Sequence, residues 1–163
     1  MKKIILILLV ALNSFACIKQ DDINIYGVEK VNISSNSRVE LGLKIENNSP
    51  SKVTIKDLNL EVKLKGNDIL KLTLVDNIIV ARRSKGVVDA NFAYKFSNPL
   101  ALLPLMGKNA NYDKLLKDIT LTGAIELKAS MINKKFKFEN NSLSEVLKST
   151  GLDPKELIKS LKL

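Results

Sequence analysis

The chain has 163 residues, 45% of them hydrophobic, and 26 Lys and Arg against 17 Asp and Glu give it a net charge of +9. This length and apolar content suit a single domain with a buried core and argue against a disordered chain. The sequence has no histidine and one cysteine, which excludes Ser-His-Asp or Cys-His catalysis and the usual zinc sites. We therefore expect no cofactor and no metal.

The remaining polar residues favour neither an enzyme nor a nucleic-acid-binding protein. Two carboxylates could act as general acid and base, but the aspartates in the body of the chain are dispersed near expected turns. They are Asp57, Asp68, Asp76, Asp89, Asp113 and Asp118. The lysines are scattered singly, and no glycine-rich phosphate loop is present. We expect a protein that is not an enzyme and binds no nucleic acid.

The first 16 residues have the order of a secretory signal peptide. Lys2 and Lys3 precede an apolar run over residues 4–12, and a short neck leads to Cys17. The run is too short for a membrane-spanning helix, which needs roughly 20 apolar residues. An export signal over residues 1–16 is therefore predicted.

The neck Ser14-Phe15-Ala16-Cys17 resembles the lipobox of bacterial lipoproteins. Ala16 matches the small residue expected before the cysteine, whereas Ser14 and Phe15 differ from the usual residues. The resemblance implies cleavage after Ala16 and attachment of diacylglycerol and a further acyl chain such as palmitate to Cys17, and two or more chains give stable attachment to a membrane. Because Cys17 is the only cysteine, it has no disulfide partner within the chain. The alternative is an unmodified thiol in an ordinary signal peptide.

Residues 17–22 form the expected lipid anchor and tether. Lys19 and Asp21-Asp22 resemble the export tag of surface-exposed lipoproteins in Bacteroidetes-type bacteria, and Ile18 stands where the inner-membrane retention signal has Asp. The resemblance implies attachment to the outer membrane, facing the periplasm or the outside. The alternative is an ordinary polar linker.

From residue 23 onwards, apolar and polar residues alternate as in half-buried strands. Strands are expected over residues 23–33 (one bent strand or two short ones), 39–45, 53–64, 70–74, 78–80, 87–96, 119–131 and 136–138. Between Ile55 and Leu58 the apolar positions change parity, which predicts a bulge near residues 56–57. On the strand over 87–96, Phe92, Tyr94 and Phe96 share the face expected to point to the core.

Turn residues separate these strands. Turns are expected at residues 47–51, 66–68 and 133–134, the last of them Asn133-Lys134. The stretch with Arg82, Arg83 and Lys85 predicts a solvated charged loop, with anion binding as the alternative.

The strand over residues 39–45 runs into Asn47-Asn48-Ser49-Pro50, which resembles a landmark of the late-embryogenesis-abundant type 2 domain, also called the water-stress and hypersensitive-response (WHy) domain. The likeness covers about residues 26–132 and includes the turn at Gly66 and the aromatic strand. It implies an immunoglobulin- or fibronectin-like antiparallel β-sandwich with, at most, a protective or lipid-associated role. It supplies no catalytic residues.

Residues 98–117 predict a helical crossover, with a short helix from Pro99, a break near Pro104 and a helical turn over residues 112–117. The crossover is expected to cap the open end of the sandwich. The alternative is a lipid-, ligand- or partner-facing patch formed by Leu100, Leu102, Leu103 and Met106.

The C-terminal residues predict a short helical hairpin. Ser142-x-x-Glu145 forms a capping box, Gly151 ends that helix, and Asp153-Pro154 begins a second one. We expect both helices to pack on the sandwich. The alternative is contact with a membrane surface.

These features predict four segments: a lipoprotein signal peptide (1–16), an anchor and tether (17–22), a β-sandwich (23–139) and C-terminal helices (140–163). The expected function is a non-catalytic binding or structural role on the membrane, with an unknown envelope protein or polymer as partner. The alternative is an apolar-ligand or lipid carrier that binds between the sheets or under residues 99–106. The carrier requires Phe92, Tyr94 and Leu102 to line a void rather than fill a core.

Overall fold

The computed structural model describes residues 19–20, 23–98, 100 and 112–145. Most of these residues lie in antiparallel strands. The strands are β1 (Lys19–Gln20), β2 (Ile23–Ser34), β3 (Arg38–Asn47), β4 (Val53–Leu64), β5 (Asn67–Leu74), β6 (Ile78–Val80), β7 (Ser84–Phe96), β8 (Ile119–Ala129) and β9 (Ile132–Ser142). Helix α3 spans Tyr112–Asp118.

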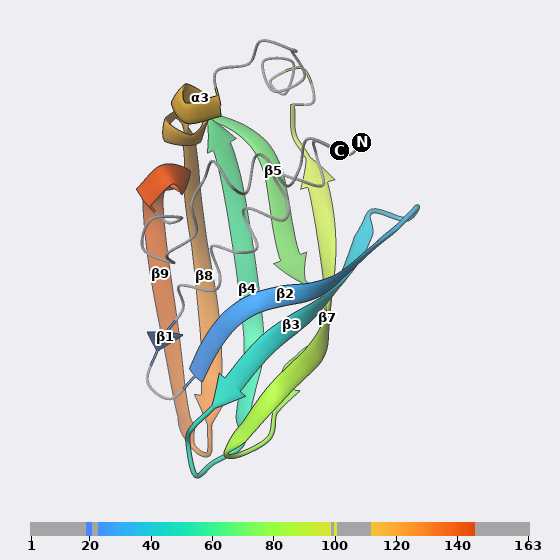
Figure 1. Ribbon diagram of the computed structural model, residues 1–163, viewed down its shortest axis with the longest axis vertical. Helices are drawn as coiled ribbons and strands as arrows, with labels where there is room; N and C mark the ends of the chain where they lie inside the picture. The colour runs from blue at the N-terminus through green and yellow to red at the C-terminus, as the bar shows by residue number, and fades with distance from the viewer. Residues whose placement is uncertain (1–18, 21–22, 99, 101–111, 146–163) are drawn as a thin grey trace.

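The strands form one curled sheet in the order β1-β2-β3-β7-β5-β4-β8-β9, with β6 paired to β4. Strand β7 joins the two layers, because residues 84–93 pair with β3 and residues 92–96 pair with β5. Figure 1 shows β2 and β3 crossing in front of β4. The predicted antiparallel β-sandwich is confirmed.

The core lies between these layers and is filled by the alternating apolar residues of both. Leu41 and Leu43 of β3, Leu58 and Leu60 of β4 and Phe92 of β7 are all 0% exposed. Fully burying a side chain of this size contributes about 1.5–3 kcal/mol relative to leaving it exposed. The period-two pattern of the sequence is therefore the main source of stability.

Changes of register occur where the apolar pattern changes parity. The predicted bulge near residues 56–57 is confirmed, because the pairing of β4 with β8 shifts between Ile55 and Asp57. This shift lets Ile55 and Leu58 both face the core. Strand β2 is a single bent strand, with two register shifts against β3.

The β8–β9 connection differs from the sequence prediction. The turn lies at Ser130 and Met131, whereas Asn133 and Lys134 lie in β9 and pair with β8. The predicted turn at Asn133-Lys134 and the predicted extension of the strand to residue 131 were therefore wrong. The observed register places the Phe138 ring over Gly123, the position in β8 that has no side chain to displace it.

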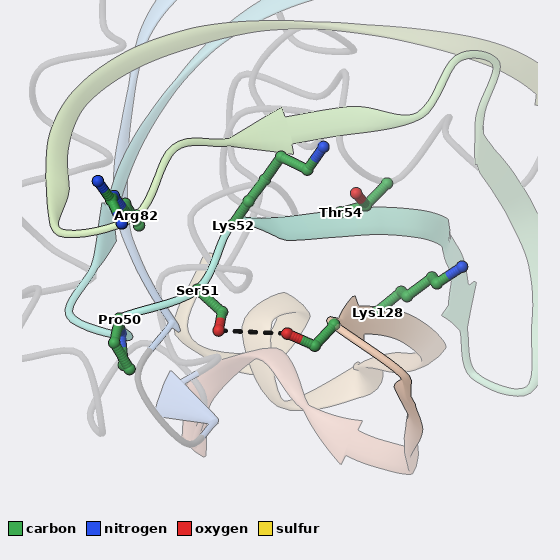
Figure 2. Close-up of a pocket in the computed structure, with 7 residues that line it drawn as sticks. Pro50, Ser51, Lys52, Thr54, Arg82 and Lys128 are labelled. Atoms are coloured by element: carbon green, nitrogen blue, oxygen red, sulfur yellow. Dashed lines mark hydrogen bonds between the residues drawn. The ribbon is translucent and has the colours of Figure 1, made fainter.

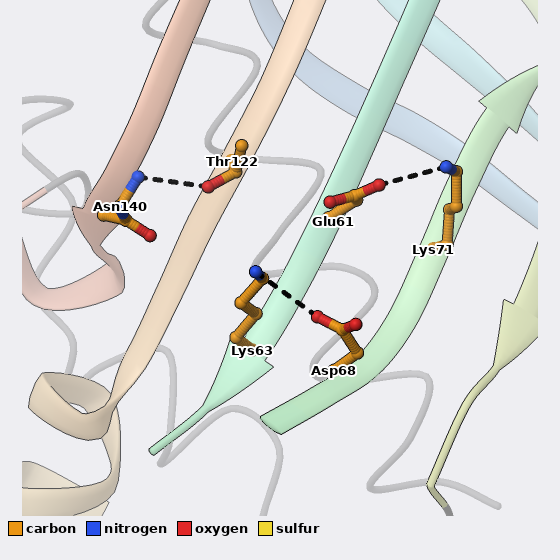
Figure 3. A network of polar contacts seen from close by, with 6 residues as sticks. All are labelled: Glu61, Lys63, Asp68, Lys71, Thr122 and Asn140. Atoms are coloured by element: carbon orange, nitrogen blue, oxygen red, sulfur yellow. Dashed lines mark hydrogen bonds and ion pairs between the residues drawn. The ribbon is translucent and has the colours of Figure 1, made fainter. Parts of the chain in front are cut away.

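The outer face of β4, β5, β8 and β9 carries exposed polar pairs (Figure 3). Lys71 Nζ lies 3.0 Å from Glu61 Oε1, and Lys63 Nζ lies 3.5 Å from Asp68 Oδ1. Ion pairs this exposed contribute little to stability. Where β9 shifts register against β8, Asn140 adopts a positive φ of 52°, and its backbone N–H donates to Thr122 Oγ1 at 3.1 Å.

Helix α3 confirms the helical turn predicted over residues 112–117. The backbone N–H of Lys65 donates to the Asp118 carbonyl at 2.9 Å, which fastens the β4–β5 turn to the end of this helix. The predicted helix from Pro99 and the break near Pro104 lie outside the described residues.

The predicted capping box begins as expected. The backbone N–H of Glu145 donates to Ser142 Oγ at 3.2 Å, and Leu143 is buried. The rest of the predicted C-terminal hairpin, from residue 146 onwards, lies outside the described residues.

We expect Ser142→Ala to lower the free energy of unfolding by about 1 kcal/mol, because it removes the oxygen that caps this helical turn. Urea denaturation followed by circular dichroism measures the change. Ser144→Ala is the matched control, and an equal loss in both variants would contradict the capping role.

Candidate functional site

Most of the predicted site residues lie outside the described residues, namely Cys17, Leu102, Leu103 and Met106. Leu100 is described and is 72% exposed. The apolar patch and the lipidation site therefore stay predictions.

The aromatic strand faces the core, as predicted. Phe92 is fully buried, and Tyr94 and Phe96 pack partly buried against the core with their ring centroids 5.5 Å apart. The carrier alternative also involves Leu102, which lies outside the described residues, so that alternative stays a prediction.

Within the described part of the chain, no group of three or more Asp, Glu, His or Cys side chains could hold a metal ion. Some carboxylates face lysines instead, as Asp57 faces Lys135 at 4.0 Å. In the same part of the chain, no helix is long and apolar enough to cross a membrane.

Three connections meet at one end of the sandwich, at the bottom of Figure 1: β3–β4, β6–β7 and β8–β9. An open pocket of about 490 Å³ lies among them. Its lining residues are Pro50, Ser51, Lys52, Thr54, Arg82, Lys128 and Ser130 (Figure 2). We call this the loop end of the sandwich.

Asn47, the last residue of β3, fixes the geometry of the loop end. Its side chain is 0% exposed. The Asn47 amide Nδ2 donates at 3.0 Å to the carbonyls of Ser51 and Ala81, with the Val80 carbonyl at 3.4 Å. Its Oδ1 accepts the backbone N–H of Ser49 at 3.0 Å. One buried amide therefore holds together the two loops that carry Lys52 and Arg82.

Serines complete this network. Ser49 Oγ accepts the backbone N–H of Ser51 at 2.9 Å, and the Ser49 carbonyl accepts the backbone N–H of Arg83 at 3.1 Å. Ser130 Oγ donates to Ser51 Oγ at 3.3 Å, which ties the β8–β9 turn to the β3–β4 loop (Figure 2). The three connections thus form one hydrogen-bonded unit.

The loop end is strongly cationic. Residues 48–52, 81–85 and 128–135 contain no Asp or Glu, and their cations are Lys52, Arg82, Arg83, Lys85, Lys128, Lys134 and Lys135. Lys85 reaches Glu46 at 3.8 Å and Lys135 reaches Asp57 at 4.0 Å. Among the described residues, no carboxylate pairs with Lys52, Arg82 or Lys128.

The charged loop is shorter than predicted. Strand β7 begins at Ser84 rather than at residue 87, because Ser84 pairs with Asn47 and Lys85 pairs with Glu46 across the sheet. Of the three predicted loop cations, only Arg82 and Arg83 remain in the loop, and Arg82 lines the pocket.

The arrangement suits diffuse attraction of negative charge rather than capture of one small anion. In Figure 2, Lys52 and Lys128 extend to the same side as Thr54, whereas Arg82 stands apart on the other loop. Lys52, Arg82 and Lys128 are exposed, and salt screens the fields of exposed charges beyond roughly 10 Å. The loop end therefore has the character of an electrostatic surface.

No protein-family model matches the chain, and a search of curated proteins finds no match. Solved structures that are similar include the GAE domain of yeast GGA1, at 14% identity and a TM-score of 0.34, covering 75% of this chain and 92% of that one. The GAE domain of GGA2p from Saccharomyces cerevisiae is 12% identical, with a TM-score of 0.35 and coverages of 74% and 87%. A protein from Archaeoglobus fulgidus is 9% identical, with a TM-score of 0.36 and coverages of 71% and 98%. Likenesses this distant carry no argument about family or function.

Proposed function

We propose that this protein is a lipid-anchored bacterial envelope protein with a non-catalytic binding or structural role. The observation that carries the proposal is the position of Cys17. It is the only cysteine, it follows a signal-like apolar run and a short neck, and it stands two residues before the first described strand at Lys19. A chain cut before Cys17 would keep every described strand of the sandwich and gain an anchor at its first residue.

The domain is proposed to be a late-embryogenesis-abundant type 2, or WHy-like, domain. The clamp made by Asn47 supports this, because it gives the asparagine of the Asn47-Asn48-Ser49-Pro50 landmark a structural task that needs no catalysis. The proposed partner is an envelope protein or polymer held near the membrane.

The proposed location is the outer membrane, facing the periplasm or the outside. The sequence around Lys19 and Asp21-Asp22 supports it through its resemblance to a surface-export tag. Fractionation of inner and outer membranes, combined with protease treatment of intact cells, tests the location and the facing separately.

Replacing Cys17 with alanine tests the anchor. We expect Cys17→Ala to abolish incorporation of labelled palmitate, because the thiol is the proposed acceptor, and to release the protein from the membrane fraction after a high-salt wash. Ser14→Ala, which changes the same neck but keeps the thiol, is expected to retain the label. Unchanged labelling of Cys17→Ala would overturn the proposed anchor.

A further inference from the structure

The tip of the β8–β9 hairpin is unusually apolar for an exposed turn. Met131 is 95% exposed and the adjacent Ile132 is 61% exposed. Ile79 of β6, 59% exposed, pairs with Thr54 in the lining of the pocket. Single exposed apolar residues are common, but here three of them lie at the loop end.

These apolar side chains lie among the cations of the loop end. Lys128 comes three residues before Met131 on the same hairpin, and Thr54 separates Lys128 from Ile79 across the sheet. Ser130, the residue before Met131, is hydrogen-bonded to Ser51, the residue before Lys52. The fold therefore presents apolar and cationic side chains on one surface, with the hairpin tied to the β3–β4 loop through Ser130 and Ser51.

The described chain also begins at the loop end. Ile23 opens β2 opposite Asn47, and Lys19 and Gln20 of β1 pair with the first two residues of β2. The first described residues therefore lie beside the loop end.

We propose that the loop end docks on an anionic lipid bilayer. Met131 and Ile132 enter the interfacial region, while Lys52, Arg82 and Lys128 contact headgroup phosphates. The proposal rests on the proposed membrane location, and it adds a second contact that does not depend on Cys17. Apolar insertion and attraction to anionic lipids add together at a bilayer surface.

A bilayer explains both halves of this surface. A soluble polyanion would use the cations, but it would gain nothing from the exposed Met131 and Ile132. A purely apolar partner would gain nothing from Lys52, Arg82 and Lys128, which it would leave desolvated without counter-charges. An anionic bilayer, with an apolar interior below a layer of negative charge, matches both.

The test uses a chain that begins at residue 17 and carries Cys17→Ala. All the described elements lie within residues 19–145, so this chain retains them while lacking both the apolar signal run and the acylated thiol. Flotation with vesicles measures binding to phosphatidylcholine alone and to phosphatidylcholine mixed with phosphatidylglycerol. We expect binding to the mixed vesicles only.

Charge removal at the two ends of the sandwich provides matched variants. Each cation close to an anionic surface is worth about fivefold in binding, so Lys52→Gln, Arg82→Gln and Lys128→Gln together should weaken binding roughly 100-fold. The control replaces Lys65, Lys95 and Lys117, which lie toward the opposite end beside α3 and the end of β7. Equal loss in both variants, or no binding by the parent chain, would overturn the proposal.

Tryptophan fluorescence tests the insertion of the tip. The chain has no Trp, so Met131→Trp places a single reporter on the hairpin and Leu100→Trp places one on the predicted patch after β7. We expect the emission of Met131→Trp to shift to the blue with mixed vesicles, and that of Leu100→Trp to stay unchanged. A blue shift for Leu100→Trp alone would overturn the docking orientation.

The failure of either idea can be recognised separately. Loss of palmitate labelling reports only on Cys17, whereas vesicle binding is measured in a chain that has no acceptor thiol. If the protein is labelled with palmitate but the chain that begins at residue 17 does not bind vesicles, the anchor stands and the docking surface is refuted. If that chain binds vesicles but the protein is not labelled, only the anchor is refuted.

Discussion

Replacing Asn47 with alanine is expected to lower the free energy of unfolding by about 3 kcal/mol. The substitution removes the donors to the Ser51 and Ala81 carbonyls and the acceptor of the Ser49 N–H. A buried group left without a partner costs about 1–3 kcal/mol. Water can reach the exposed Ala81, so the total stays below the sum of the individual costs. Urea denaturation followed by circular dichroism measures the change.

Two further variants test whether the loss of stability comes from these hydrogen bonds. Asn48→Ala, at the exposed neighbouring position, is expected to change stability by less than about 0.5 kcal/mol. Asn47→Asp keeps the oxygen that accepts from Ser49 but turns a second oxygen toward carbonyl oxygens, so it should destabilise at least as much as alanine. If Asn47→Ala is as stable as Asn48→Ala, the clamp is not what holds the two loops.

Replacing Gly123 with alanine is expected to lower the free energy of unfolding by about 3 kcal/mol. A Cβ at this position would lie 2.5 Å from the Asn59 carbonyl oxygen and 2.5 Å from Phe138 Cζ. The ring can turn aside, but the carbonyl belongs to the backbone of β4, which pairs with β8. The methyl group therefore forces the two strands apart or displaces the aromatic ring from the sheet.

Gly86→Ala is the matched control, because no atom lies within 4 Å of the added Cβ. It is expected to be neutral or slightly stabilising, since alanine restricts the unfolded chain more than glycine does. Combining Gly123→Ala with Phe138→Leu should recover only part of the loss, because the contact with Asn59 remains. Thermal melting of the unsubstituted protein, Gly123→Ala, Gly86→Ala and the double variant measures these differences in stability. Equal stability of the two single alanine variants would contradict the packing argument.

The alternation of apolar residues predicted the sandwich because each strand buries one face. It even located the bulge in β4, since Ile55 and Leu58 could both reach the core only if the register shifted between them. The β8–β9 turn was misplaced because Asn133-Lys134 has stronger turn chemistry than Ser130-Met131. The observed register pairs Phe138 with Gly123, a contact outside the turn that the turn residues themselves do not indicate.

The loop end could not be predicted from sequence. The sequence predicts ordinary loop or strand positions for Pro50, Arg82 and Lys128. Only the topology of the sheet brings these three residues together. The sequence predicts Asn47 to be a turn residue, whereas its side chain is a buried hydrogen-bonding centre. Its place directly after an apolar strand and three residues before Pro50 was the available signal. The lipid anchor, in contrast, rests on sequence alone.

The bulged strand β9 also matters for how copies of this protein meet. It forms one edge of the sheet, and an open edge can pair with the edge of another molecule. Such pairing would promote clustering of copies. Lys134, Lys135 and Lys137 place like charges along this edge, and the irregular backbone at Asn140 interrupts its hydrogen-bonding pattern. Strand β9 is therefore a poor template for edge-to-edge aggregation, which favours separate copies of this protein at high local concentration.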